Sequence, residues 1–234
     1  NSTNQYSCAA EALNIGAQKA KGDFFVFCHQ DISWSNPFFI EELELKLKAL
    51  PQLFVAGAAG KCKQYPKTVI GNITQSNPPH NLMNSAIAPI TKPFSCQTLD
   101  EVFLCIPRIF FEKMRFDEIV CYGWHLYSVD YCLSAIENNI PIFVIPLQFY
   151  HASIGASFNN SYYGILKKVV RKHRKKFKKI YTTMGNWVTN PITIRVFILY
   201  KQLRNKVKKL FTKNKLTRAI VQAYQKKKYG QIYS

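Results

Sequence analysis

One stretch decides the fold of this 234-residue chain: Ala20-Lys21-Gly22-Asp23-Phe24-Phe25-Val26-Phe27-Cys28-His29-Gln30-Asp31. A Gly-Asp turn precedes five apolar residues, and this run predicts a short strand covered on both faces of an α/β sheet. Ligands of open α/β sheets bind outside the carboxyl ends of strands. We therefore expect His29, Gln30 and Asp31 to lie at the mouth of a functional site.

Alternating helical and strand patterns surround this stretch. We expect helices at 7–21, 36–50, 107–114 and 127–138, and strands at 53–59, 98–106 and 142–145. Residues 61–95 are rich in Asn, Pro, Thr and Ser, which indicates a long irregular connection with a hairpin at 68–74. The alternation predicts an α/β fold with a mostly parallel sheet flanked by helices.

Charge divides the chain into two parts. The sequence has 32 Lys and Arg against 13 Asp and Glu, a net charge of +19, and every acidic residue precedes residue 161. We expect a domain at 1–160 and a basic helical tail at 161–234. The seven cysteines are scattered without a CxxC pair, which favours reduced thiols over a disulfide frame or a zinc site.

The two ends of the sequence and its apolar runs bear on where the protein acts. No apolar stretch reaches 18 residues, so we expect no membrane span. No signal peptide is visible, and the chain begins at Asn1 without Met. We expect that an upstream segment has been lost.

Candidate ligating groups follow several of the expected strands. A hard divalent cation prefers carboxylate oxygen, and imidazole can complete its shell, so Asp31 and His151 form the expected metal pair. The alternative is structural: Asp31 would cap the turn after its strand, and His151 would be a satisfied buried histidine.

An ordered set of motifs carries a resemblance to a known family. The set comprises Asn14-x-Gly16, Ala20-Lys21-Gly22-Asp23, His29-Gln30-Asp31, Leu99-Asp100-Glu101-Val102, Phe116-Asp117-Glu118, Tyr127-Ser128-Val129-Asp130-Tyr131-Cys132-Leu133 and His151-Ala152-Ser153-x-Gly155. It resembles the inverting glycosyltransferases of the family-2 type, which have the GT-A fold. Within these it is most similar to the small bacterial glycosyltransferase-like group with a His-Gln-Asp metal motif, over about residues 8–156.

The resemblance implies roles for individual residues. Asp31 would bind a divalent cation, Mn²⁺ or Mg²⁺, that bridges the nucleotide diphosphate. His29 occupies the place of the first acid of the family's Asp-x-Asp motif, and His151 matches the family's late histidine. Asp130 would be the general base, although Val129 replaces its companion acid. The alternative for Asp130 is a first-turn carboxylate facing the helix dipole.

Further residues would contact the substrates. The resemblance implies that Asp100 lines the donor-sugar pocket, together with His29 and Gln30, and that Asp117 orients a loop over the acceptor. Trp124 and His125 could stack on a sugar ring, with core packing as the alternative for Trp124. Family members begin with a strand that grips the nucleotide base, and its absence before Ser7 leads us to expect an N-terminally truncated domain.

Two functions follow from these expectations. The first is an inverting glycosyltransferase that moves a sugar from a nucleotide-sugar donor to a hydroxyl of a surface glycan or lipid-linked acceptor. We expect it to be cytoplasmic and peripheral on the inner face of the cell membrane, because basic helices with apolar stripes bind anionic membrane surfaces. The second is a non-catalytic basic adaptor whose tail binds membrane or nucleic acid. A solvated helical extension or an oligomer contact is a further interpretation of the tail.

Overall fold

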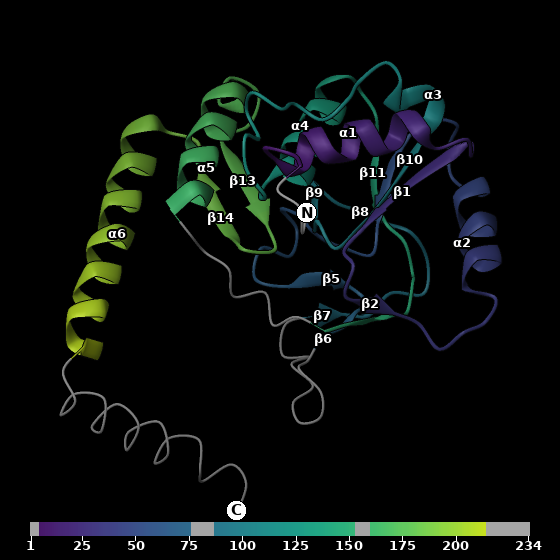
Figure 1. The fold of residues 1–234 in the computed structure, drawn as a ribbon, viewed down its shortest axis with the longest axis horizontal. Helices are drawn as coiled ribbons and strands as arrows, with labels where there is room; N and C mark the ends of the chain where they lie inside the picture. Colours follow the sequence, from purple (N-terminus) through teal and green to yellow (C-terminus); the bar gives the residue numbers. More distant parts are fainter. Residues whose placement is uncertain (1–4, 76–86, 153–159, 214–234) are drawn as a thin grey trace, which may run out of the picture. The chain divides into compact units, whose positions relative to one another are not determined.

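A computed structural model describes residues 5–75, 87–152 and 160–213 (Figure 1). The chain forms two compact units, Asn1–Pro191 and Ile192–Ser234. Ser153 and Gly155 of the last motif, and the end of the basic tail after residue 213, lie outside the described residues.

The main sheet of the first unit has five strands. In spatial order they are β1 (Phe24–Cys28), β10 (Phe103–Pro107), β3 (Val55–Gly57), β11 (Ile142–Val144) and β8 (Phe94–Ser95). Only the β3–β11 pairing is parallel, whereas the other three pairings are antiparallel. The expectation of a mostly parallel sheet is therefore wrong.

The reason lies in which strands follow helices. β1, β3 and β11 each follow a helix and run in one direction, as crossover connections require. β8 and β10 arise from the segment between residues 61 and 107, whose described residues contain no helix, and both run in the opposite direction. Because β10 lies between β1 and β3, it makes both of its pairings antiparallel.

Two of the three smaller sheets of the unit lie within residues 32–151. One contains β2 (Ile32–Ser33), β12 (Tyr150–His151) and β6 (Thr74–Gln75), and the other contains β7 (Ile87–Ala88), β5 (Val69–Gly71), β4 (Ala59–Lys61) and β9 (Thr98–Leu99). The hairpin expected at 68–74 is absent from the described residues, since β5 and β6 belong to different sheets. The strand expected at 53–59 is likewise divided between β3 and β4, which lie in two sheets.

The four helices expected in the first 160 residues are confirmed, with shifted ends. They are α1 (Ala9–Lys19), α2 (Phe39–Lys48), α3 (Arg108–Phe111) and α4 (Tyr127–Glu137). The start of α1 is secured by Glu11, whose carboxylate accepts hydrogen bonds from the Ser7 amide and hydroxyl.

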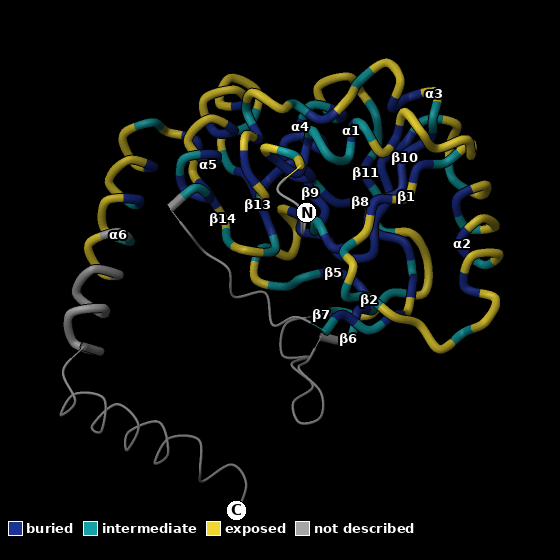
Figure 2. Tube along the Cα trace, viewed as in Figure 1, coloured by how far each residue is buried: buried dark blue, intermediate teal, exposed yellow. Residues whose placement is uncertain are grey.

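β1 is buried on one face only, which corrects the expectation of a strand covered on both faces. Phe25 and Phe27 are buried and pack against Phe111, with ring centroids 5.3 and 5.2 Å apart. Val26 and Cys28 alternate with them and are exposed. Figure 2 colours the chain by burial. β1 forms one edge of its sheet, so its pleat divides inward from outward side chains. All seven cysteines are free, and six are buried.

The first compact unit extends past the boundary at residue 160 that the charge suggested. It includes α5 (Asn160–His173) and an unexpected hairpin of β13 (Lys179–Thr182) and β14 (Gly185–Val188). The apolar stripe of α5 is core: Ile165, Leu166, Val169 and Val170 are all buried. Of the basic region, α6 (Pro191–Lys213) continues into the second unit. Among the described helices, none has the length and hydropathy needed to cross a membrane.

Candidate metal centre

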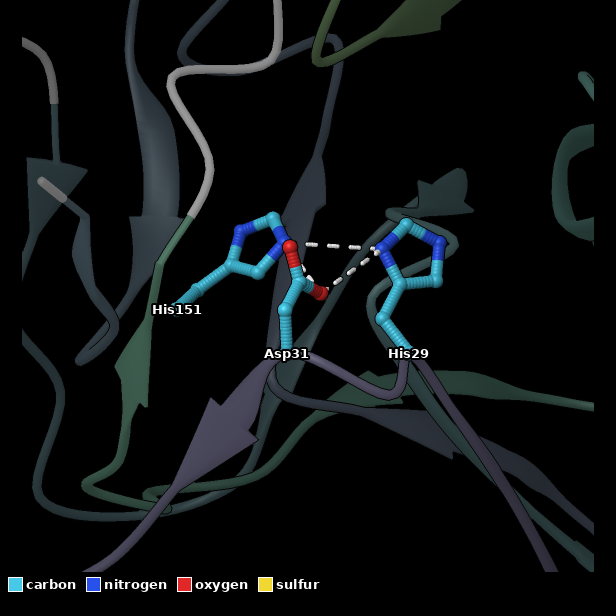
Figure 3. A group of neighbouring side chains, drawn as sticks. All are labelled: His29, Asp31 and His151. Carbon is cyan, nitrogen blue, oxygen red and sulfur yellow. Dashed lines mark hydrogen bonds and ion pairs between the residues drawn. The ribbon is translucent and has the colours of Figure 1, made fainter. Parts of the chain in front are cut away.

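Three side chains meet where β1 ends. His29 follows β1 directly, Asp31 precedes β2, and His151 ends β12. β2 and β12 pair antiparallel with His151 opposite Ile32, and the Ala152 amide donates to the Asp31 carbonyl at 2.9 Å. This pairing brings residues 120 positions apart in the chain to one place, and Figure 3 shows the three side chains pointing toward one another.

The distances within this triad suit one shared ion. His151 Nε2 lies 3.3 Å and His29 Nδ1 lies 3.9 Å from Asp31 Oδ1, and the two ring nitrogens are 3.5 Å apart. An ion about 2.1 Å from each ligand separates neighbouring ligand atoms by about 3.0 to 3.4 Å. Asp31 Oδ1 is also buried without a hydrogen-bond partner. A small inward movement of His29 would therefore complete a three-ligand site.

The donor set discriminates between metals. Two imidazoles and one carboxylate suit a transition ion such as Mn²⁺ better than Mg²⁺, which prefers an all-oxygen shell. Burial lowers the pKa of His29, and the opposing field of Asp100 does not restore it, so the ring is neutral near pH 7. A neutral imidazole is the form that binds a metal.

Asp100 is close enough to the triad to act on His29 electrostatically. Its Oδ1 accepts from the Val102 amide, whose carbonyl in turn accepts from the His29 amide at 3.1 Å. Its Oδ2 accepts from the Thr183 hydroxyl, in the turn of the β13–β14 hairpin. The structure therefore places the expected donor-pocket residue beside the expected metal site. Gln30, between the two N-terminal ligands, is exposed.

Glu101 stands beside Asp100 in the Leu99-Asp100-Glu101-Val102 motif, but the sequence analysis assigned it no role of its own. Its Oε1 is buried without a hydrogen-bond partner. Burial raises the pKa of Glu101 well above the ordinary carboxyl value, and Asp100 raises it further, against the backbone amides of Leu126 and Tyr127 that donate to the carboxylate. Its only sequence signal is its place after Asp100, because the amides that contact its carboxylate come from residues 25 and 26 positions further along the chain.

Asp130 lies in a separate, saturated cluster. Its Oδ1 is 2.9 Å from His173 Nε2, and its Oδ2 accepts from Lys172 Nζ at 2.7 Å. The other ring nitrogen of His173 is 2.9 Å from Glu137 Oε1. Asp130 and His173 are both buried. The structure thus brings Asp31 and His151 together, as expected, but directs the Asp130 carboxylate toward α5.

Three other expected site residues lie near this second cluster or at the surface. Asp117 accepts from the Ile119 and Val120 amides and pairs with Lys172 at 3.0 Å. Burial alone would raise the pKa of Asp117, but the Val120 amide and Lys172 outweigh it and hold the pKa below its usual value. Trp124 is exposed, and His125 packs edge-on against Tyr162 with ring centroids 5.7 Å apart.

Comparisons with known proteins identify no sequence relatives. No protein-family model matches the chain, and no curated protein sequence matches it. Solved structures do match, among them the crystal structure of GalNAc-T7 with UDP, GalNAc and Mn²⁺. That chain is 12% identical, and the superposition has a TM-score of 0.49 over 72% of this chain. The superposition spans 35% of the length of the GalNAc-T7 chain.

Proposed function

We propose that this protein is a glycosyltransferase that uses a divalent cation held by His29, Asp31 and His151. It would move a sugar, with inversion, from a nucleotide-sugar donor to a hydroxyl of a surface glycan or lipid-linked acceptor. The observation that carries the proposal is the convergence of these three ligating atoms within 4.8 Å of one another at the end of β1. The ordered motifs that resemble family-2 glycosyltransferases support the same reaction class.

The three residues of the triad would contribute differently to cation binding. Asp31 supplies the negative charge, and the two histidines supply neutral nitrogen ligands that fix its position. A bound cation would stabilise the charge that develops on a departing diphosphate. Asp100 is held by the Val102 amide and the Thr183 hydroxyl but, unlike the buried Asp130, is partly exposed, so its carboxylate could accept further hydrogen bonds from donor hydroxyls beside the metal.

Proton removal from the acceptor needs a free carboxylate oxygen. Asp130 was expected in this role, but both of its oxygens are within hydrogen-bond distance of cationic or imidazole nitrogens of α5. Glu101 has one oxygen without such a partner. We therefore include both residues in the test, because replacement of the catalytic base by an amide should abolish sugar transfer.

The first experiment measures metal binding. Isothermal titration with MnCl₂ should detect a site in the wild-type chain, and binding should weaken by at least about 100-fold in Asp31→Asn, which removes the only charged ligand. Asp23→Asn, which neutralises an exposed aspartate before β1, is the matched control and should bind Mn²⁺ normally. Equal binding by wild type and Asp31→Asn would overturn the metal assignment.

The second experiment measures transfer. A panel of UDP- and GDP-sugars is incubated with the protein and Mn²⁺, and release of the nucleoside diphosphate is measured by anion-exchange chromatography after quenching with EDTA. We expect release by wild type and Asp23→Asn and none by Asp31→Asn. Glu101→Gln and Asp130→Asn then identify the base. Mn²⁺ binding without turnover of any donor would contradict the transferase proposal while leaving the metal centre in place.

One observation favours a second function. If Asp130 is the base position and its carboxylate is committed to α5, the first unit would be a transferase-like domain without catalysis. The protein would then be a basic adaptor that binds a partner surface through its C-terminal region. Either function is compatible with the proposed place at the cytoplasmic face of the membrane.

A further inference from the structure

The basic helices α5 and α6 have similar patterns of basic and apolar residues but differ in whether their apolar residues are buried. In α5 the apolar stripe belongs to the core, and Ile165, Leu166 and Val169 are fully buried. In α6 a comparable stripe is exposed: Val196 is 61%, Leu199 65% and Leu203 63% accessible. The stripe of α5 is therefore used inside the first unit, whereas that of α6 has its side chains in solvent.

The exposed apolar residues of α6 share one face. Ile192, Val196, Leu199 and Leu203 follow one another at spacings of four, three and four residues, which keeps them on one side of a helix. Tyr200 widens the same face and is 57% accessible. Ile194 and Ile198 are buried and, at about 100° per residue, lie on the opposite side. We call the five exposed residues the α6 stripe.

Positive charge borders the α6 stripe on both sides. At about 100° per residue, Arg195 lies on one flank and Arg204 on the other, and both are exposed. No acidic residue occurs in α6 or anywhere after residue 160. Long basic side chains beside an apolar face can keep their charged ends at a polar boundary while the apolar face is buried. This arrangement is typical of helices that lie in a membrane interface.

A second exposed helix provides the contrast within the same molecule. α2 and its N-cap residue Phe38 also expose large apolar residues, with Ile40 57% and Leu45 70% accessible. They stand among acidic residues of α2: Glu41, Glu42 and Glu44. Lys46 and Lys48 of α2 pair with Glu42 and Glu44, so the helix carries mixed charge with one carboxylate in excess, whereas α6 has basic residues and no acidic one. Exposed apolar area alone therefore does not distinguish the two helices, but the net charge beside it does.

We propose that the α6 stripe docks the protein on an anionic lipid bilayer, with the apolar side chains in the headgroup boundary and Arg195 and Arg204 at lipid phosphates. Nucleic acid would use the arginines but would leave the apolar side chains in water. A second copy of α6 could cover the stripe, but it would bring like charges together along both flanks. The inference needs no metal and no transfer reaction, so it stands or fails independently of the proposed function.

Vesicle flotation of the full-length chain tests the proposal. We expect binding to phosphatidylcholine vesicles that contain about one-third phosphatidylserine and little binding to pure phosphatidylcholine. Leu199→Glu/Leu203→Glu should reduce partitioning at least about tenfold, because both side chains would have to leave the apolar boundary. Arg195→Ser/Arg204→Ser should also reduce it at least about tenfold, and added salt should abolish the difference from wild type.

Two controls make the result specific. Leu45→Glu changes an equally exposed leucine of α2 and should leave partitioning unchanged. Leu199→Gln/Leu203→Gln removes apolar area without adding negative charge, and should weaken binding as well. Circular dichroism verifies that each variant keeps its helix content. These controls separate loss of the stripe from loss of the fold and from charge repulsion.

Several outcomes would overturn the proposal. These are no wild-type binding to anionic vesicles, equal binding to neutral vesicles, or full binding by Leu199→Glu/Leu203→Glu. Retention on an RNA or DNA duplex without retention on vesicles would assign the basic flanks to nucleic acid. A concentration-dependent dimer that Leu199→Glu/Leu203→Glu dissolves, again without vesicle binding, would assign the stripe to a second copy of the chain.

Discussion

Two clusters of aspartate and histidine in this molecule have similar composition but differ in how far the carboxylate oxygens are hydrogen-bonded. Around Asp31 two imidazoles approach one carboxylate at 3.3 and 3.9 Å, and the contacted oxygen has no hydrogen bond. Around Asp130 an imidazole and an ammonium group approach at 2.9 and 2.7 Å, and each oxygen has its own partner. The first arrangement leaves bonding capacity for an ion, whereas the second uses it to join α4 to α5. Residue types alone therefore do not distinguish a metal-binding site from a buried ion-pair cluster that stabilises the fold.

Asp130→Asn should have the largest effect on stability. The amide would leave Lys172 without its buried counter-charge and would place an N–H group against His173 or Lys172. Removing one partner of a buried pair costs about 3 to 5 kcal/mol in the free energy of unfolding. Urea denaturation of Asp130→Asn beside Asp31→Asn measures the contrast, and we expect the latter to lose less than about 1 kcal/mol.

The same two variants can contradict the assignment of Asp31 to a metal site and of Asp130 to a structural cluster. Asp130 would be a catalytic residue rather than a structural one if Asp130→Asn kept the wild-type unfolding midpoint and lost sugar transfer. Conversely, a large loss of stability in Asp31→Asn without metal would make Asp31 structural. Asp23→Asn again serves as the reference for removing a carboxylate that neither cluster contains.

Glu101→Gln tests a carboxyl that is intermediate between the two clusters: its Oε1 is buried without a partner, as is Asp31 Oδ1, but the backbone amides of Leu126 and Tyr127 donate to the carboxylate. Because the folded state raises the pKa of Glu101, the folded protein retains this proton to a higher pH than the unfolded chain. Stability should therefore decrease as pH rises above about 4.5, the ordinary carboxyl value. Glu101→Gln should stabilise the protein by about 1 kcal/mol or more at pH 8 and have little effect near pH 4.

Thermal unfolding across this pH range provides the measurement, with Glu112→Gln as the control. Glu112 is an exposed carboxylate at the end of α3, and its replacement should change the free energy of unfolding by less than about 1 kcal/mol. A destabilised Glu101→Gln at pH 8 would show that the carboxylate is ionised and stabilising in the folded protein, against the direction of the pKa shift.

Asp117→Asn should have the smallest effect. The asparagine oxygen can still accept from the Ile119 and Val120 amides, so the change isolates the pair with Lys172. This pair is partly exposed, and its loss should cost at most about 1 kcal/mol at pH 7. The folded pKa of Asp117 is lowered, so its contribution is present above pH 3.8 and disappears as pH falls through the folded value.

A thermal unfolding series from pH 3 to pH 7 measures this contribution. A loss above about 3 kcal/mol in the free energy of unfolding at pH 7 would show that Asp117 belongs to the ion-pair cluster of Asp130, Lys172 and His173. That result would extend the saturated cluster rather than the metal centre. Lys172 itself has a raised pKa: burial lowers it, but the Asp130 carboxylate and the hydrogen bonds to Asp130 and Asp117 outweigh burial.

Local sequence signals were sufficient for the helices and for part of the site. The apolar spacing of α4 and the turn before β1 predicted elements that the structure confirms, and Asp31 lies 3.3 Å from His151, the partner expected for it. The boundary of the first unit was not predictable from charge, because α5 exposes basic residues on one face while it buries Val169 and Val170 on the other. Net charge reports only the outer face of such a helix.

The amino-acid sequence by itself determined the amphipathic helices, the strand that ends in His29-Gln30-Asp31 and the concentration of positive charge after residue 160, because these depend on local propensity and composition. The sequence analysis also paired Asp31 with His151, a contact that the structure makes through the pairing of β2 with β12. Only the tertiary structure decided that Asp130 contacts His173, through the packing of α4 on α5. That contact joins residues 43 positions apart, and no local pattern specifies a partner at such a separation.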